Sequence, residues 1–346
     1  MRLALTAFTR RGYALARDLA AALEERGDRA ALALPARLAG ELGAEEYASL
    51  AAWTGERFQD CQGLIFVGAC GIAVRAIAPH VRDKFTDPAV VSVDEAGRIA
   101  VPLLSGHVGG ANELALWVAG RTGGEVAVST ATDVNGAFAV DRWAKRQGLF
   151  LDSREAAKRV SAAVLARVPV GVSSDFPIQG GLPSGLRFGP AEVGICLTLD
   201  PEKAPFPVTL RLVPPVLTLG IGCRRGTPAE TLRRRVEDVL KEHRLTRRAV
   251  FQASTLDLKG DEPGLLELCR AWEIPLVTWT AEELARTEGE FTPSAFVSRV
   301  TGVDNVCERA AVRAGGALLV PKQAGEGVTV AVARRPWTIS FDEGEK

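Results

Sequence analysis

The sequence has no apolar run of the roughly 18–20 residues that a membrane-spanning helix needs. Its start, MRLALTAFTRRGYALARDL, is apolar over only six residues before Arg10 and Arg11, which is too short for a secretory signal peptide. Neither sign of charge dominates, because 42 basic residues face 42 acidic ones. We therefore expect a cytoplasmic protein with no membrane partner and no nucleic-acid partner.

Side chains that bind metals are also scarce. There are three histidines, and no two of the six cysteines have the C-x₂₋₄-C spacing of a zinc knuckle. His243 lies in the charged segment KEHR, where we expect it to face solvent, so two histidines remain as candidate ligands. We expect no protein-bound metal, and cysteines that are reduced and mostly buried.

The 346 residues are enough for two or three domains. Short apolar runs alternate with helical patterns over most of the chain, which predicts the α/β class with mainly parallel sheets. We predict an N-terminal α/β domain over 1–134, a smaller, irregular middle domain over 135–214, and a C-terminal α/β domain over 215–346. The middle region is assigned by its Gly- and Pro-rich segment SSDFPIQGGLPSGLRFGP.

Three local patterns in the sequence predict particular elements. The turn DEAGR joins expected strands at 90–93 and 99–104 and predicts a hairpin. A helix is expected around 44–53. The run Thr227-Pro228-Ala229-Glu230 predicts a helix that begins with Thr227 as its N-cap and Pro228 in its first turn.

The segment LLSGHVGGANELA joins an expected strand to an expected helix. Its glycines allow close approach to a ligand, and the helix start offers free N–H groups to an anion. His107 can act as a general base near neutral pH. The pattern equally suits a tight turn with a hydrogen-bonded histidine, and it matches neither the dinucleotide fingerprint nor the P-loop. The candidate residues are Ser105, Gly106, His107, Gly109, Gly110, Asn112 and Glu113.

Two further segments follow expected strands of the same domain. In VGACGIAVRAIAPHVRDKFTDP the candidates are Gly68, Gly71, Arg75 and Lys84, because ligands bind at the carboxyl ends of strands in open α/β sheets. A solvated face with helix caps is the alternative. In STATDVNGA, Thr130, Thr132 and Asp133 can bind polar ligand groups or orient His107, or the segment can cap the next helix.

The segment LGIGCRRGTPAE joins a strand to a helix near the C-terminus. Arg224 and Arg225, with Gly222 before them, form a candidate carboxylate site beside the helix N-terminus. Cys223 has no neighbour in sequence that would make it a nucleophile. Lys259 and Lys322 also follow strands, and we favour a surface role for both.

Three segments of the chain, taken in order, resemble the N-terminal domain of the cobalt-precorrin-5A hydrolase family. They are GIAVRAIAPHVRDKFTDPAVVSVDEAG, LLSGHVGGANELA and STATDVNG. This is the cobalamin biosynthesis protein G family of the anaerobic route to vitamin B12. Three later segments resemble the C-terminal domain of this family: LGIGCRRGTPAE, VDNVCERAAV and LLVPKQAGEGVTVAVAR. The resemblance covers nearly the whole chain, and the middle region matches mainly by position.

The resemblance implies a reaction on a cobalt-containing corrinoid with acetate and propionate arms. Water opens a δ-lactone between the ring A acetate and the methylated carbon bridging rings A and D. That carbon leaves as acetaldehyde, and the product is cobalt-precorrin-5B. Cobalt arrives inside the substrate, so no cofactor is expected. Neighbouring methyltransferases of the pathway are candidate partners.

Such a reaction needs a base for the water, donors for the oxyanion and cations for the carboxylate arms. We assign catalysis to His107, Glu113, Asp133 and Lys84. Substrate binding is assigned to Gly68, Gly71, Arg75, Ser105, Gly106, Gly109, Gly110, Asn112, Thr130, Thr132, Gly222, Arg224 and Arg225. Two alternatives remain: a non-catalytic corrinoid carrier or scaffold of the same pathway, and an unrelated hydrolase or transferase with an anion-binding glycine loop.

Overall fold

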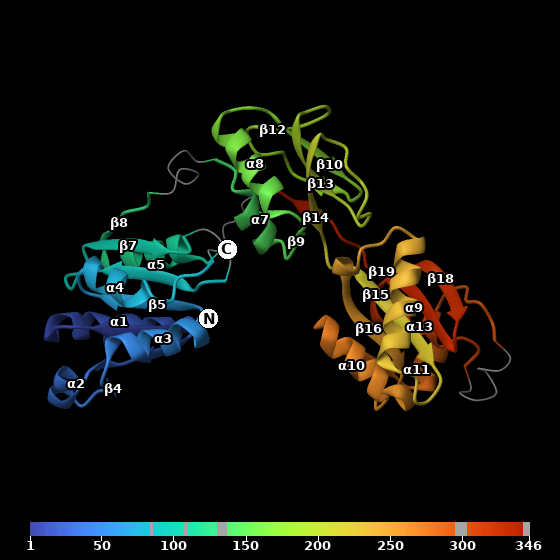
Figure 1. The fold of residues 1–346 in the computed structure, drawn as a ribbon, viewed down its shortest axis with the longest axis horizontal. Helices are drawn as coiled ribbons and strands as arrows, with labels where there is room; N and C mark the ends of the chain where they lie inside the picture. The colour runs from blue at the N-terminus through green and yellow to red at the C-terminus, as the bar shows by residue number, and fades with distance from the viewer. Residues whose placement is uncertain (84–85, 107–108, 130–136, 295–302, 342–346) are drawn as a thin grey trace. The chain divides into compact units, whose positions relative to one another are not determined.

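The structure is a computed structural model that describes residues 1–83, 86–106, 109–129, 137–294 and 303–341 (Figure 1). The chain divides into two compact units, Met1–Ala137 and Phe138–Lys346. Within them lie three larger sheets, one in each of the three predicted segments. The α/β class is confirmed. The domain boundaries stay a prediction.

The first unit is built on a six-stranded sheet with the order β2-β1-β5-β6-β7-β8. Strands β1, β2, β5 and β6 are parallel, β7 is antiparallel to β6, and β8 is parallel to β7. The strands are β1 (Arg2–Ala7), β2 (Arg29–Leu32), β5 (Gly63–Val67), β6 (Ala89–Val93), β7 (Ile99–Leu104) and β8 (Glu125–Val126), with a small pair β3 (Leu34–Pro35) and β4 (Glu46–Tyr47). The helices are α1 (Arg10–Glu25), α2 (Ala36–Leu42), α3 (Leu50–Asp60), α4 (Cys70–Ile77) and α5 (Ala111–Thr122).

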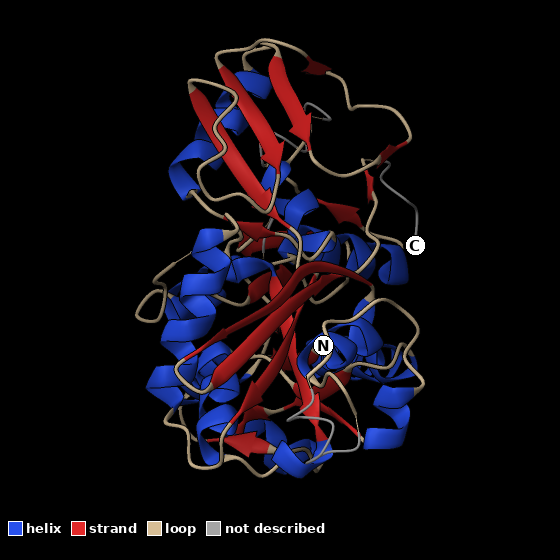
Figure 2. Cartoon of the chain, turned by 90° about the vertical axis from the view of Figure 1, so that its right-hand side faces the viewer, coloured by secondary structure: helices blue, strands red, loops and turns tan. Residues whose placement is uncertain are grey.

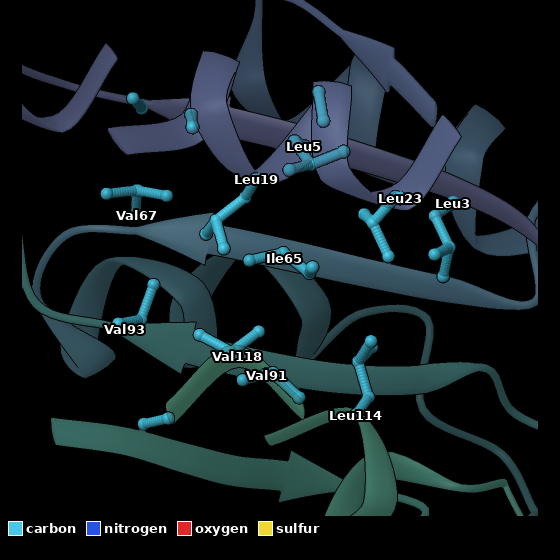
Figure 3. Packing of buried hydrophobic residues seen from close by; sticks show 14 of the residues in the cluster. Leu3, Leu5, Leu19, Leu23, Ile65, Val67, Val91, Val93, Leu114 and Val118 are labelled. Carbon is cyan, nitrogen blue, oxygen red and sulfur yellow. The ribbon is translucent and has the colours of Figure 1, made fainter. Parts of the chain in front are cut away.

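The core of this unit follows from the alternation of side chains along its strands. Leu5 of β1 and Ile65 of β5 lie in the same cluster as Leu19 and Leu23 of α1, and Figure 3 shows these side chains packed together. The intervening strand residues, such as Phe66, pack into a second cluster with α3 and α4. Helices therefore cover both faces of the sheet, as parallel strands require.

The helix predicted around 44–53 begins later than predicted. α3 starts at Leu50 and shares only residues 50–53 with the predicted range, because β4 takes up Glu46–Tyr47 before it. Gly43 ends α2 in the left-handed conformation, with φ of 63°. Ser49 then caps α3, since its side chain accepts a hydrogen bond from the Ala52 N–H.

The second unit begins with a sheet of order β12-β10-β13-β14-β9. It is more regular than its Gly- and Pro-rich sequence indicated. Its strands are β9 (Phe150–Leu151), β10 (Val170–Ser174), β12 (Leu186–Phe188), β13 (Val193–Leu197) and β14 (Val208–Val213), with helices α7 (Val140–Arg146) and α8 (Arg154–Leu165). β20 (Ile339–Ser340), in the last described segment, pairs with β11 (Ile178–Gln179) of this region.

The last sheet has the order β17-β16-β15-β19-β18, and Figure 2 shows its long strands in red. β15, β16 and β17 are parallel, while β19 is antiparallel to both β15 and β18. The elements are β15 (Leu217–Cys223), α9 (Ala229–Glu242), η1 (Arg247–Ala249), β16 (Val250–Leu256), η2 (Asp257–Lys259), α10 (Pro263–Trp272), β17 (Leu276–Trp279), α11 (Ala281–Ala285), α13 (Cys307–Gly315), β18 (Ala317–Gly325) and β19 (Val328–Arg334).

The start of α9 differs from the prediction. Pro228, not Thr227, is the N-cap, and no side chain caps the helix. The Thr227 hydroxyl instead donates a hydrogen bond to the Arg224 carbonyl, at 2.8 Å. Thr227 therefore closes the turn after β15, which shapes the Arg224–Arg225 segment.

Candidate functional site

Ser105 has an unusual backbone conformation at the start of the glycine loop, by which we mean Ser105–Asn112. Its φ is 55°, in the left-handed region that residues other than glycine rarely adopt. The side chain is buried, and its hydroxyl donates to the Asp87 carbonyl at 2.9 Å. The Ser105 carbonyl accepts a hydrogen bond from the Ala111 N–H. The loop is thus tied to the segment that precedes β6.

Two glycines of the loop are required by close packing. A Cβ on Gly109 would lie 2.2 Å from the Cβ of Ser105, and one on Gly106 would lie 2.7 Å from Oδ1 of the buried Asn112. Gly110 has a φ of 89° and stands at the N-cap of α5. Close packing and backbone conformation are therefore enough to explain these glycines, whether or not a ligand binds to the loop.

The loop can also offer hydrogen bonds to an anion. The N–H groups of Ala111 and Asn112 are taken by the carbonyls of Ser105 and Gly106. Near the start of α5, the amides of Gly109, Gly110 and Glu113 have no hydrogen-bond partner among the described residues and can face a ligand. They lie at the N-terminus of the 12-residue helix α5, where the helix dipole favours negative charge. Glu113 itself is exposed in the first turn.

The sheet separates two groups of predicted site residues. Because β7 is antiparallel to β6, Ser105 lies at the edge where β5 and β6 begin. Gly68, Gly71 and Arg75 lie where β5 ends, at the opposite edge, and the five residues of β5 span roughly 16 Å. Arg75 is exposed and donates to the Gly71 carbonyl. One carboxylate cannot contact both groups.

The segment after β8 begins on the side of the glycine loop. β8 is parallel to β7, so both strands end at the same edge of the sheet. Ser129 is the last described residue before STATDVNG continues. Five predicted site residues lie outside the described residues: Lys84, His107, Thr130, Thr132 and Asp133.

We expect Gly109→Ala to destabilise the first unit by about 1–3 kcal/mol, because the new methyl group has no room against Ser105. Gly120→Ala is the matched control: Gly120 lies on α5 with nothing within 4 Å of an added Cβ, so alanine should be neutral or stabilising by up to ~1 kcal/mol. Chemical denaturation of both variants measures this. Equal stability of the two variants would contradict the packing described for the loop.

The second unit has a cavity of about 540 Å³, called here the C-terminal pocket. It opens where β15 and β16 end, between the start of α13 and the β18–β19 hairpin. Four lining residues are cationic, and none of the described lining residues is Asp or Glu. The lining residues are Gly222, Cys223, Arg224, Arg225, Thr255, Leu256, Leu258, Lys259, Ser294, Asn305, Val306, Cys307, Lys322, Ala324, Gly325, Gly327, Val328 and Thr329.

The predicted arginine pair differs in its partners. Arg225 is held by the exposed Asp261, with 2.9 Å between Nη1 and Oδ1, and by the Leu258 carbonyl. The guanidinium of Arg224 has no ion-pair partner among the described residues. Lys259 pairs with the fully buried Glu262 at 3.4 Å. Of the four cations, Arg224 and Lys322 are therefore the ones open to a ligand.

Sequence reasoning missed a buried polar network beside the pocket. Glu308 is fully buried and accepts hydrogen bonds from the Thr292 N–H and hydroxyl, the Asn305 amide and the Lys322 N–H. Asparagine occurs only three times in the chain, but this scarcity does not indicate which residue Asn305 hydrogen-bonds to. The network fixes the backbone of Lys322 and so places this lysine at the pocket.

The two cysteines of the pocket are poor nucleophiles. Burial raises the pKa of the Cys223 thiol, and the Lys259 ammonium offsets this only in part. Burial raises the pKa of Cys307 to about 11. Both stay protonated near neutral pH, so the pocket is suited to binding rather than to thiolate chemistry.

Among the described residues, no three His, Cys, Asp or Glu side chains gather as a metal site. The expectation that the protein needs no metal and no cofactor stays a prediction. None of the described helices is both long and apolar enough to cross a membrane.

The described residues form an α/β protein whose second unit holds a pocket lined by cationic and apolar side chains. Family models match residues 52–133 (cobalamin synthesis G N-terminal), 138–214 (cobalamin biosynthesis central region) and 217–333 (cobalamin synthesis G C-terminus). The chain belongs to the cobalt-precorrin-5A hydrolase family, as the resemblance predicted.

The chain is similar in sequence to two enzymes of this name. The cobalt-precorrin-5A hydrolase of Salmonella typhimurium is 37% identical over 289 residues, which is 80% of this chain and 82% of that protein. The enzyme of the same name from Priestia megaterium is 33% identical over 302 residues, 81% and 80% of the two chains. A solved structure described as a cobalamin biosynthesis protein G homologue from Sulfolobus solfataricus covers 96% of both chains at 18% identity, with a TM-score of 0.43.

Proposed function

We propose that this protein is a cobalt-precorrin-5A hydrolase of anaerobic cobalamin biosynthesis. The observation that carries the proposal is its similarity to enzymes of that name over four fifths of the chain. The glycine loop supports it, because its open amides stand at a helix N-terminus, where an oxyanion can be stabilised.

In the proposed reaction, His107 takes a proton from water as the oxygen adds to the acyl carbon of the lactone. The acyl–oxygen bond then breaks and leaves the ring A acetate as a carboxylate. The alkoxide on the former bridging carbon forms a carbonyl while its carbon–carbon bond to the macrocycle breaks. The bonding electron pair stays on the macrocycle, which takes up a proton, and acetaldehyde leaves. Glu113, Asp133 and Lys84 are the other proposed catalytic groups.

Purified protein mixed with the lactone intermediate tests this proposal. We expect one acetaldehyde per macrocycle, measured with alcohol dehydrogenase and NADH, together with a change in the visible spectrum of the corrinoid. Binding of the corrinoid without acetaldehyde release would instead favour a carrier or scaffold of the same pathway.

The proposal has consequences for cofactor, partners and compartment. Cobalt enters as part of the substrate, so activity should survive dialysis against a chelator. Activity that is lost on dialysis and regained with a divalent metal would contradict this.

All six cysteines are free, which fits the reducing cytoplasm we propose as the compartment. Pathway methyltransferases are the proposed protein partners.

A further inference from the structure

We propose that the C-terminal pocket binds carboxylate arms of the corrinoid, with Lys322 and Arg224 as its two anion-binding groups. This inference rests on the proposed function for the identity of the ligand. It adds a binding role for Lys322, which the sequence had placed on the surface, and it separates the roles of Arg224 and Arg225.

The position of the pocket in the sheet is that of a ligand site. The pocket lies beyond the carboxyl ends of the parallel strands β15 and β16. Ligands of open α/β sheets bind at this edge of the sheet. Gly220 shows how closely α13 approaches β15: an added Cβ would lie 1.8 Å from the Cys307 carbonyl oxygen. The start of α13 is thereby held at the pocket.

The pocket combines apolar walls with cations. Leu258 and Val306 contribute apolar surface, and Leu258 is 58% exposed. The volume, about 540 Å³, lies in the range of small-molecule sites. It is suited to one part of a tetrapyrrole with its arms rather than to the whole macrocycle. An apolar ring system with carboxylates at its rim matches both properties.

The hydrogen-bond network around Glu308 positions Lys322 at the pocket. Its N–H donates to Glu308 Oε1 at 2.6 Å, which fixes the backbone of β18 at this point. The Glu308 carboxylate is occupied by its other donors, Thr292 and Asn305. The Lys322 ammonium has no ion-pair partner among the described residues, and its side chain is half-buried in the pocket lining. A ligand carboxylate would supply the missing counter-charge.

Arg224 is placed by the tip of the β18–β19 hairpin. A Cβ on Gly327 would lie 3.3 Å from Cδ of Arg224, so the arginine stem rests on this glycine. The neighbouring Arg225 is already paired with Asp261, and a ligand would have to compete with that carboxylate. The two adjacent arginines should therefore contribute unequally to binding.

The test is an anaerobic titration of the corrinoid's visible absorbance with wild type, Lys322→Ala, Arg224→Ala and Arg225→Ala. We expect the dissociation constant to rise roughly 10- to 150-fold for Lys322→Ala and for Arg224→Ala, and less for Arg225→Ala. Lys322→Arg should restore most of the affinity. Lys241→Ala, at an exposed lysine in the last turn of α9, is the control and should bind as wild type does.

Measurements of acetaldehyde turnover distinguish the role of the C-terminal pocket from the proposed hydrolase activity. Loss of contacts to remote arms should raise KM and leave kcat nearly unchanged. Unchanged affinity and KM in Lys322→Ala and Arg224→Ala, with wild-type acetaldehyde release, would overturn the pocket assignment alone. Lysine-dependent corrinoid binding by a wild-type protein that releases no acetaldehyde would overturn the hydrolase proposal and leave the pocket in place.

Discussion

Replacement of His107 by glutamine is expected to lower kcat for acetaldehyde release about 10²–10⁴-fold, the usual contribution of a general base. Glutamine keeps hydrogen-bonding capacity but cannot accept the proton of the attacking water. Corrinoid affinity and unfolding free energy should change little, because the base acts on the water rather than on the macrocycle. Stopped-flow or steady-state measurement of acetaldehyde gives kcat directly.

His243→Gln is the matched control. His243 is exposed at the C-cap of α9, in the second unit, so the same substitution there should leave turnover unchanged. Near-normal kcat in His107→Gln would move the base to Asp133 or Glu113. A collapse of thermal stability in His107→Gln would assign the histidine to the structure of the loop instead.

Glu308→Ala is expected to reduce the free energy of unfolding of the second unit by about 2–4 kcal/mol. The substitution leaves the buried amide of Asn305 and the part-buried N–H groups of Thr292 and Lys322 without this acceptor. Each unsatisfied buried donor costs about 1–3 kcal/mol, and partial relaxation keeps the sum below simple addition. Urea denaturation of the full chain measures the change.

Glu282→Ala provides the comparison for an exposed carboxylate. Glu282 pairs with Arg286 on the surface of α11, where an ion pair contributes at most ~0.5 kcal/mol. We expect its stability to match wild type. A loss of less than about 1 kcal/mol in Glu308→Ala would show that the network does not hold Lys322 at the pocket.

The sequence predicted local elements well where one pattern decided them. The strand Ile99–Leu104 matches its predicted bounds, and the hairpin between β6 and β7 is present. The same hairpin places the glycine loop and Gly68 at opposite edges of the sheet. That consequence could have been drawn from the sequence, because an antiparallel strand must end where its partner begins.

Other features depend on residues distant in sequence. Glu308 appears in the sequence as an ordinary acidic residue in the first turn of a helix, and its burial depends on Thr292 and on the strand that carries Lys322. Arg225 forms its ion pair with Asp261, 36 residues away. No local pattern encodes these partners, so the difference between Arg224 and Arg225 needed the tertiary structure.

Hydrolysis in H₂¹⁸O tests the central claim most directly. If the chain opens the lactone by attack of water on the acyl carbon, mass spectrometry of the macrocyclic product will show one ¹⁸O in the ring A carboxylate, with acetaldehyde formed in equal amount. The same reaction with His107→Gln should give the same label at the reduced rate. Recovery of the unlabelled lactone, bound to the protein and without acetaldehyde, would contradict the account and leave a corrinoid carrier.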